Sequence, residues 1–364
     1  MKRSLACATG LLLGLSLSVS AAGKGEIHFA NWGDYIGPTT LADFEKETGI
    51  KVVLTPFESG QILETKLLTG NAGYDVVVPA ADFLARQLKA GVYQPLDQAQ
   101  LGNAKNLDPA LMQRLTESDP GNRYSVPYLW GTVGIGYNPA KVKAALGSDA
   151  PLDSWDLLFK PENLAKLKSC GVAFLDEPGK VIPLAMLYQG KDPNSEKPED
   201  YAAATRLLQT LSPSVTYFSS TKYIADLANG DICVALGFSG DVLQAQQSAA
   251  AAGKATEVRY AVPKEGTNVW FDNLTIPKDA PNPQGAHAFI DYLLRPDVIA
   301  KVSDYLHYAN PNDAALPLMD PAVRDNPAVY PSPALVEKMY VSLPPSPSIL
   351  RLITRNWSTI KSGV

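Results

Sequence analysis

Apolar and polar positions alternate between strand and helix patterns over the first 60 residues of the predicted folded region. Residues 26–30 alternate in polarity, which predicts a strand. A helical stretch over 40–47 follows the capping residue Thr39 and stops at Gly49. The series continues with a strand over 51–54, a helix over 61–68 and an apolar strand over 74–79. This order predicts an α/β layer structure.

A different pattern begins near residue 124. Residues 124–138 are extended, aromatic and interrupted by three glycines, which predicts a strand that crosses between domains, with glycine allowing a hinge. Apolar runs at 172–175 and 232–236 predict two further strands, and residues 259–263 and 269–276 predict the return crossing. In α/β sheets of this kind, ligands collect at the carboxyl ends of the strands.

The N-terminal segment has the features of an export signal. Met1-Lys2-Arg3 is positively charged, an apolar run covers 11–19, and Ser20-Ala21-Ala22 offers small residues for cleavage. We therefore expect residues 1–22 to be a signal peptide. Cys7 lies before the apolar run, which argues against a lipid-modified cysteine. No later stretch has the roughly 20 apolar residues of a membrane-spanning helix, so we expect a soluble exported protein.

The length and the net charge of the chain limit the classes of protein to which it can belong. The 364 residues exceed one ordinary core and predict two domains. The 32 Lys and Arg against 37 Asp and Glu give a net charge of −5. Removal of the signal peptide takes away Lys2 and Arg3, which leaves 30 basic and 37 acidic residues and a net charge of −7. This acidic balance argues against a nucleic-acid partner. Only three histidines are present, so no His-rich metal site is expected.

The cysteines are consistent with an oxidising compartment. Once the signal is removed, Cys170 and Cys233 remain as an even pair, and a disulfide is the natural interpretation. The alternative is two buried free thiols. Neither cysteine belongs to a CxxC motif, which disfavours zinc or thioredoxin-like chemistry.

Motifs of common enzymes are not found. Residues 237–240 lack the spacing of a nucleophile elbow, and the glycines at 131–136 have the wrong order for a dinucleotide fingerprint. A two-carboxylate glycosidase stays open, because any two acids at strand ends can be paired in space.

Aromatic and acidic residues recur together at the predicted strand ends. The instances are Trp32 with Asp34 and Tyr35, Phe238 with Asp241, Trp270 and Phe271 with Asp272, the pair Asp176-Glu177, and Tyr308 in a loop-like stretch. Aromatic faces attract cations and pack along alkyl chains, and carboxylates neutralise ammonium groups. The set predicts a cleft for a long, flexible, polycationic amine. A sugar cleft stays open, because sugars also stack on aromatic rings and bind carboxylates.

Seven motifs that include these residues closely resemble the periplasmic polyamine-binding proteins, the putrescine- and spermidine-binding components of bacterial ABC importers. The motifs are at 31–36 (NWGDYI), 75–79 (DVVVP), 126–132 (VPYLWGT), 226–230 (DLANG), 239–242 (SGDV), 263–266 (PKEG) and 293–298 (LLRPDV). The resemblance runs over essentially the whole mature chain.

The resemblance implies an α/β, two-lobed periplasmic solute-binding fold with hinge-crossing strands and an interlobe cleft that closes on one amine. It implies a monomeric, non-enzymatic protein without metal or cofactor that delivers polyamine to an ABC transporter permease driven by a separate ATPase. We expect lobe 1 to comprise residues 23–132 and 258–312, and lobe 2 to comprise residues 133–257 and 313–364.

The family's binding residues can be carried over by position. Trp32, Trp270 and Tyr308 are expected to form an aromatic box around the methylene chain. Asp241 and Asp272 are expected to hold one ammonium or a central amine, and Asp34 and Glu177 the other end. Tyr35 and Ser220 match positions that add hydrogen bonds, Phe238 matches a position that is often Trp or Tyr, and Cys170 and Cys233 match the family's disulfide.

Four departures from the family pattern affect the expected contacts. Gly33 and Ala80 each replace a hydroxyl residue, Phe238 lacks a polar atom, and Asp82 brings an extra carboxylate to the rim. Trp270 resembles spermidine-preferring relatives, whereas Asp176-Glu177-Pro178 looks like the putrescine type. Spermidine and putrescine are therefore not ranked. Another amine, such as cadaverine or agmatine, or a non-amine solute remains the alternative.

Overall fold

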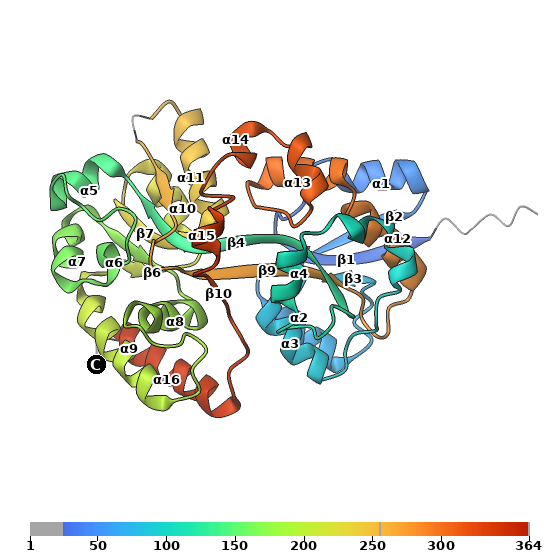
Figure 1. Ribbon diagram of the computed structural model, residues 1–364, viewed down its shortest axis with the longest axis horizontal. Helices are drawn as coiled ribbons and strands as arrows, with labels where there is room; N and C mark the ends of the chain where they lie inside the picture. Colours follow the sequence, from blue (N-terminus) through green and yellow to red (C-terminus); the bar gives the residue numbers. More distant parts are fainter. Residues whose placement is uncertain (1–24, 255, 363–364) are drawn as a thin grey trace, which may run out of the picture.

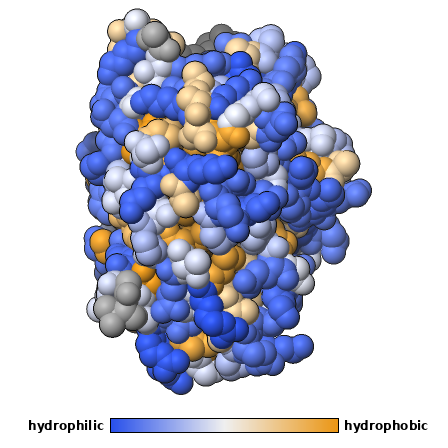
Figure 2. Space-filling model, turned by 90° about the vertical axis from the view of Figure 1, so that its left-hand side faces the viewer, coloured by the Kyte–Doolittle hydropathy of each residue, from blue (hydrophilic) through white to orange (hydrophobic). Residues whose placement is uncertain are grey.

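The protein consists of two α/β lobes joined by long strands, as Figure 1 shows for the computed structural model. The structure describes residues 25–254 and 256–362, so the predicted signal peptide lies outside the described residues. One ten-stranded sheet system runs through both lobes in the order β2-β1-β3-β9-β4-β7-β5-β6, with β10 beside β9 and β8 beside β4. In Figure 2, the end of lobe 2 is mostly hydrophilic, with apolar side chains in small separate areas.

Lobe 1 is built on the predicted strand–helix series. β1 (Glu26–Trp32) lies between β2 (Lys51–Phe57) and β3 (Val76–Val77), and both pairings are parallel. The predicted strand over 74–79 is shortened to two paired residues, although positions 74–79 are all buried. The helices and helical turns of this lobe are α1 (Thr40–Thr48), α2 (Gly60–Thr69), α3 (Ala81–Lys89), η1 (Gln98–Gln100), η2 (Gly102–Asn106), α4 (Pro109–Leu115), α12 (Pro283–Leu293), α13 (Pro296–Leu306), η5 (Asp313–Leu318), α14 (Pro321–Arg324) and α15 (Pro333–Val336).

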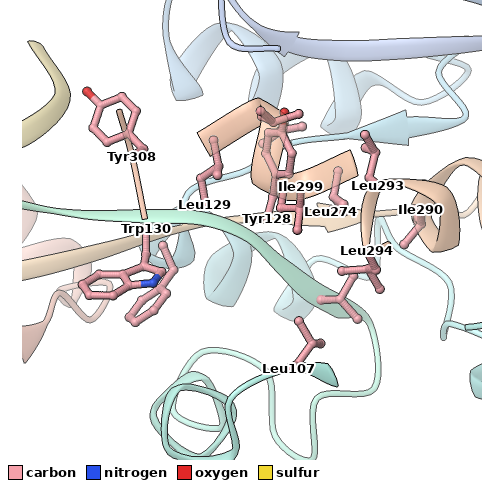
Figure 3. Close-up of a cluster of buried hydrophobic side chains, with 14 of the residues drawn as sticks. Leu107, Tyr128, Leu129, Trp130, Leu274, Ile290, Leu293, Leu294, Ile299 and Tyr308 are labelled. Atoms are coloured by element: carbon pink, nitrogen blue, oxygen red, sulfur yellow. The ribbon is translucent and has the colours of Figure 1, made fainter. Parts of the chain in front are cut away.

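Strand β4 (Ser125–Tyr137) confirms the predicted crossing element and is buried along all of its 13 residues. Its first half pairs antiparallel with β9 (Asn268–Thr275), and its second half pairs with β7 (Val234–Phe238) and β8 (Arg259–Ala261). Side chains of the lobe 1 core lie on both sides of β4, with Trp130 below the ribbon and Tyr308 above it in Figure 3.

The glycines of β4 have a packing role. A Cβ at Gly136 would lie 2.7 Å from a Val242 methyl, and one at Gly134 would lie 2.6 Å from the Ala261 carbonyl oxygen. Neither glycine has a positive φ. Close approach of neighbouring elements therefore explains these glycines, and the hinge stays a prediction.

Lobe 2 extends the sheet with the parallel strands β7, β5 (Val172–Phe174) and β6 (Tyr217–Phe218). Its buried apolar cluster is separate from that of lobe 1. The helices and helical turns are α5 (Pro139–Leu146), α6 (Asp156–Phe159), α7 (Pro161–Leu167), η3 (Lys168–Cys170), α8 (Pro178–Tyr188), α9 (Pro198–Leu211), η4 (Ser212–Ser214), α10 (Lys222–Asn229), α11 (Ser239–Ala251) and α16 (Pro347–Ser362).

The C-terminal segment divides between the lobes. Buried residues from Ala315 to Val341 belong to the lobe 1 cluster, including the region of β10 (Tyr340–Val341), whereas α16 packs into the lobe 2 cluster. This packing differs from the expected division, which assigned all of 313–364 to lobe 2. We therefore propose that residues 313–341 belong to lobe 1.

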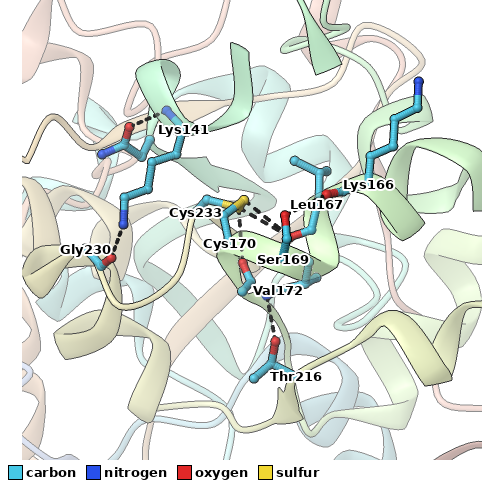
Figure 4. Close-up of a disulfide and its surroundings, with 11 residues drawn as sticks. Lys141, Lys166, Leu167, Ser169, Cys170, Val172, Thr216, Gly230 and Cys233 are labelled. Carbon is cyan, nitrogen blue, oxygen red and sulfur yellow. Dashed lines mark hydrogen bonds between the residues drawn. A yellow bond between two sulfur atoms is a disulfide. The ribbon is translucent and has the colours of Figure 1, made fainter. Parts of the chain in front are cut away.

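A disulfide joins Cys170 to Cys233, with the two Cα atoms 5.4 Å apart, which confirms the predicted pairing. Figure 4 shows it between η3 and the residue before β7, close to Leu167 and Val172. The bond closes a loop with a sequence separation of 63 residues. It ties two neighbouring segments of lobe 2 together at the end opposite to the carboxyl ends of β5 and β7.

Candidate functional site

The strand ends of the two lobes meet where the crossing strands pass between them. In lobe 2, Ala173 of β5 pairs with Ala235 of the parallel strand β7, so the chain leaves both strands at the same edge. In lobe 1, Ala80 bridges to Asp272 of β9, which places the start of α3 beside that strand. The predicted acids and aromatic residues therefore converge from separate parts of the sequence.

Four aromatic rings form a row from one lobe to the other. Ring centroids are separated by 6.2 Å for Phe238 and Trp270, 5.1 Å for Trp270 and Tyr308, and 5.7 Å for Tyr308 and Tyr35. Each pair meets edge to face, an arrangement favoured by aromatic quadrupoles. Trp270 packs against both apolar clusters, so it lies at the boundary between the lobes.

Two glycines make room for these rings. A Cβ at Gly131 would clash with the ring of Trp270, and a Cβ at Gly240 would clash with the ring of Tyr308. Both rings therefore lie directly on backbone, which fixes their positions.

Asp241 is held by two tyrosines. Its carboxylate accepts hydrogen bonds from the hydroxyls of Tyr223, at 2.7 Å, and Tyr308, at 2.9 Å. Burial raises the pKa of Asp241, and the two hydrogen bonds oppose that shift. The carboxylate thus has an orientation set by both lobes.

Asp272 is only 6% exposed, and burial raises its pKa to about 7. The Tyr35 hydroxyl favours the charged form, and so, to a smaller extent, does the Trp32 indole N–H; the charge of Asp82 disfavours it. These two donors are buried and make no standard hydrogen bond to a described group, and the same is true of the Trp270 indole N–H. Unpaired buried donors are uncommon in proteins. The Tyr35 hydroxyl can also accept a hydrogen bond from a ligand ammonium, whereas the two indole N–H groups can only donate.

Glu177 is the N-cap residue of α8, in the short connection that follows β5. Burial raises the pKa of the Glu177 carboxyl. The positive charge of Lys180 lowers this pKa, and the negative charge of Asp82 raises it. The Ser220 hydroxyl, which is buried without a standard hydrogen bond to a described residue, also favours the charged form of Glu177.

The structure brings most of the predicted residues together. They are Trp32, Tyr35, Asp82, Glu177, Ser220, Phe238, Asp241, Trp270, Asp272 and Tyr308. Asp34 is different: it is exposed, has a φ of 51°, and its carboxylate makes no hydrogen bond or ion pair to the rest of the described chain. Its predicted ligand contact stays a prediction.

Sequence reasoning missed Tyr223 and Lys180. Tyr223 lies on α10, 18 residues before Asp241, and nothing in its local pattern indicates the contact. The sequence does contain a clue to Lys180, because a lysine in the first turn of a helix is disfavoured by the helix dipole.

The site combines a row of aromatic faces with four carboxylates and several unpaired donors. Across residues 25–254 and 256–362, no three His, Cys, Asp or Glu side chains are grouped to hold a metal ion. Within the same ranges, no helix has the length and apolar character needed to cross a bilayer. Two cavities of about 210 and 430 Å³ lie elsewhere on lobe 1. The arrangement suits a ligand with cationic groups and an apolar chain.

The fold and site define a two-lobed solute-binding protein. Residues 39–331 match the family of bacterial extracellular solute-binding proteins, and the chain belongs to this family.

Several relatives of this chain have names that state which ligand they bind. A putrescine-binding periplasmic protein of Pseudomonas aeruginosa is 51% identical over 97% of this chain and 98% of its own length. A putrescine-binding periplasmic protein of Escherichia coli is 52% identical over 97% and 96%. A crystal structure of a spermidine/putrescine ABC transporter substrate-binding protein from Streptococcus pneumoniae has a TM-score of 0.80 and 28% identity, over 93% of this chain and 99% of that one.

Proposed function

We propose that this protein is the periplasmic substrate-binding component of an ABC importer, and that it captures putrescine, spermidine or both for a membrane permease. The observation that carries the proposal is the row of Phe238, Trp270 and Tyr308 between the lobes, with Asp241 and Asp272 beside it. The names of the relatives at 51% and 52% identity support the same ligand class.

The chemistry of the site explains how a polyamine would be held. Ring faces pack along the methylene chain, and each cation–π contact contributes about 0.5–2 kcal/mol. Buried carboxylates neutralise the ammonium groups, and loss of one such partner costs about 2–5 kcal/mol. Because the rings and acids come from both lobes, a bound amine bridges the lobes and favours the closed form.

The proposal also covers the oligomeric state of the protein and its role in delivering the amine. The rings and carboxylates of the site all come from a single chain, which supports a monomer as the binding unit. The proposed role is binding and delivery without chemical conversion of the amine.

Isothermal titration of the mature chain with putrescine, cadaverine, spermidine, spermine and agmatine tests the proposal. We expect binding well below millimolar concentration for putrescine or spermidine. Asp241→Asn is expected to weaken it strongly, whereas Asp149→Asn, at an exposed site on lobe 2, serves as the matched control. Failure of all five amines to bind below millimolar would overturn the proposal.

A further inference from the structure

Lys180 is a cation at the edge of the acidic site. It lies in the first turn of α8, three residues after Glu177, and its backbone N–H donates to the Glu177 carbonyl at 2.9 Å. Glu177 is the N-cap residue of α8, and its carboxyl lies close enough to Lys180 for the lysine charge to lower its pKa. The Lys180 side chain is half-buried.

Local structure does not account for this lysine. The first turn of α8 has no acidic residue, and a positive charge there opposes the helix dipole. Within the described chain, no carboxylate lies within 4.0 Å of the Lys180 ammonium, so it makes no ion pair. A surface ion pair is therefore not the reason for its position.

The carboxyl groups on which the Lys180 charge acts, Glu177 and Asp272, belong to the candidate site. The parallel register of β5 with β7 brings the start of α8 to the edge from which Phe238 and Asp241 leave the sheet. The other charged groups that act on Glu177 are Asp82, from lobe 1, and Asp241. The Lys180 charge favours the ionised forms of Glu177 and Asp272, the same effect that a ligand ammonium would have.

We propose that Lys180 is a specificity-determining residue, which opposes the second ammonium of a diamine at the Glu177 side of the site and favours a ligand end that is uncharged or anionic. The inference rests on the proposed function, because it presumes that the site binds amines. Two like charges that share the same carboxylates repel each other, and the partly buried position reduces screening by water.

Three ligands with the same four-carbon chain separate this role from a structural one. Putrescine has two ammonium groups, butylamine has one, and 4-aminobutyrate has an ammonium and a carboxylate. We expect Lys180→Gln to bind putrescine about tenfold more tightly, to bind butylamine within about twofold of the wild type, and to bind 4-aminobutyrate more weakly. Lys180→Arg keeps the charge and is expected to retain the wild-type order.

Lys166→Gln is the matched control, because it removes one exposed positive charge from α7 of the same lobe. It should leave all three affinities unchanged. Equal changes for the three ligands in Lys180→Gln, or no gain for putrescine, would overturn the role of Lys180 while leaving polyamine binding intact. Absence of putrescine and spermidine binding in both the wild type and Lys180→Gln would instead overturn the proposed function.

Discussion

Tyr308, which packs in the core of lobe 1, donates a hydrogen bond of 2.9 Å to the carboxylate of Asp241 on α11 of lobe 2. This contact joins the lobes at the site itself. The same tyrosine meets Trp270 at 5.1 Å, so one side chain contributes both to the aromatic row and to the orientation of an acid.

Tyr308→Phe should weaken polyamine binding by about tenfold or more, because a hydrogen bond to a charged group contributes about 1.5–3 kcal/mol. The ring and its packing are retained. Titration calorimetry measures the loss, and Tyr305→Phe, at a side chain that is 57% exposed, is the control. An unchanged affinity would show that Tyr223 alone orients Asp241.

Polyamine affinity should fall by about tenfold between pH 8 and pH 6, because a cation binds the ionised form of Asp272, whose pKa is raised to about 7. Binding at pH 6 should also release protons. Titrations in buffers of different ionisation enthalpy count them, and Asp272→Asn should bind weakly with less pH dependence. A constant affinity across this range would contradict the raised pKa.

The pH dependence of the unliganded fold should have the opposite sign. A folded pKa raised above the unfolded value means that the folded state holds a proton that the unfolded state releases. Asp272 therefore contributes stability at acidic pH that is lost as pH rises from about 4 to about 7. Urea unfolding of the wild type and Asp272→Asn over this window measures the contribution, which should be absent from the variant.

Trp270→Phe should weaken spermidine more than putrescine, because the larger ring covers a longer stretch of methylene chain. Trp270 also packs against both apolar clusters, so the melting temperature should fall as well. Competition titrations with the two amines provide the comparison. Equal losses for both would assign Trp270 to packing alone.

Replacing both cysteines by serine should lower the free energy of unfolding by about 4 kcal/mol, the chain-entropy value for a loop of this length. Polyamine affinity should be preserved, because the disulfide lies away from the site. Urea unfolding and titration of the same variant measure both quantities. A large loss of affinity would instead link the disulfide to the geometry of the site.

Strand positions could be predicted closely because buried strands leave runs of apolar residues. The strands expected at 26–30, 51–54 and 269–276 are found at 26–32, 51–57 and 268–275. The strand expected at 74–79 has two paired residues, because backbone pairing depends on neighbouring strands and not on apolar character alone.

The site was predictable where aromatic and acidic residues lie together in sequence, as in Trp270 with Asp272. It was not predictable where tertiary packing makes the contact. Tyr223 reaches Asp241 from another helix, and its ring lies against Gly237, where a Cβ would approach to 2.5 Å. The division of residues 313–364 that we propose likewise rests on packing that no local pattern encodes.

The placement of the C-terminal segment has a consequence for the order of folding. Helix α16 supplies Ile349, Ile353, Trp357 and Ile360 to the lobe 2 core, and residues up to Val341 complete the lobe 1 core. Lobe 1 can therefore assemble its buried cluster without α16, whereas the cluster of lobe 2 needs this helix, which lies far along the chain from Val258, the preceding fully buried member of that cluster. Removal of α16 should therefore destabilise lobe 2 while leaving the buried apolar cluster of lobe 1 intact.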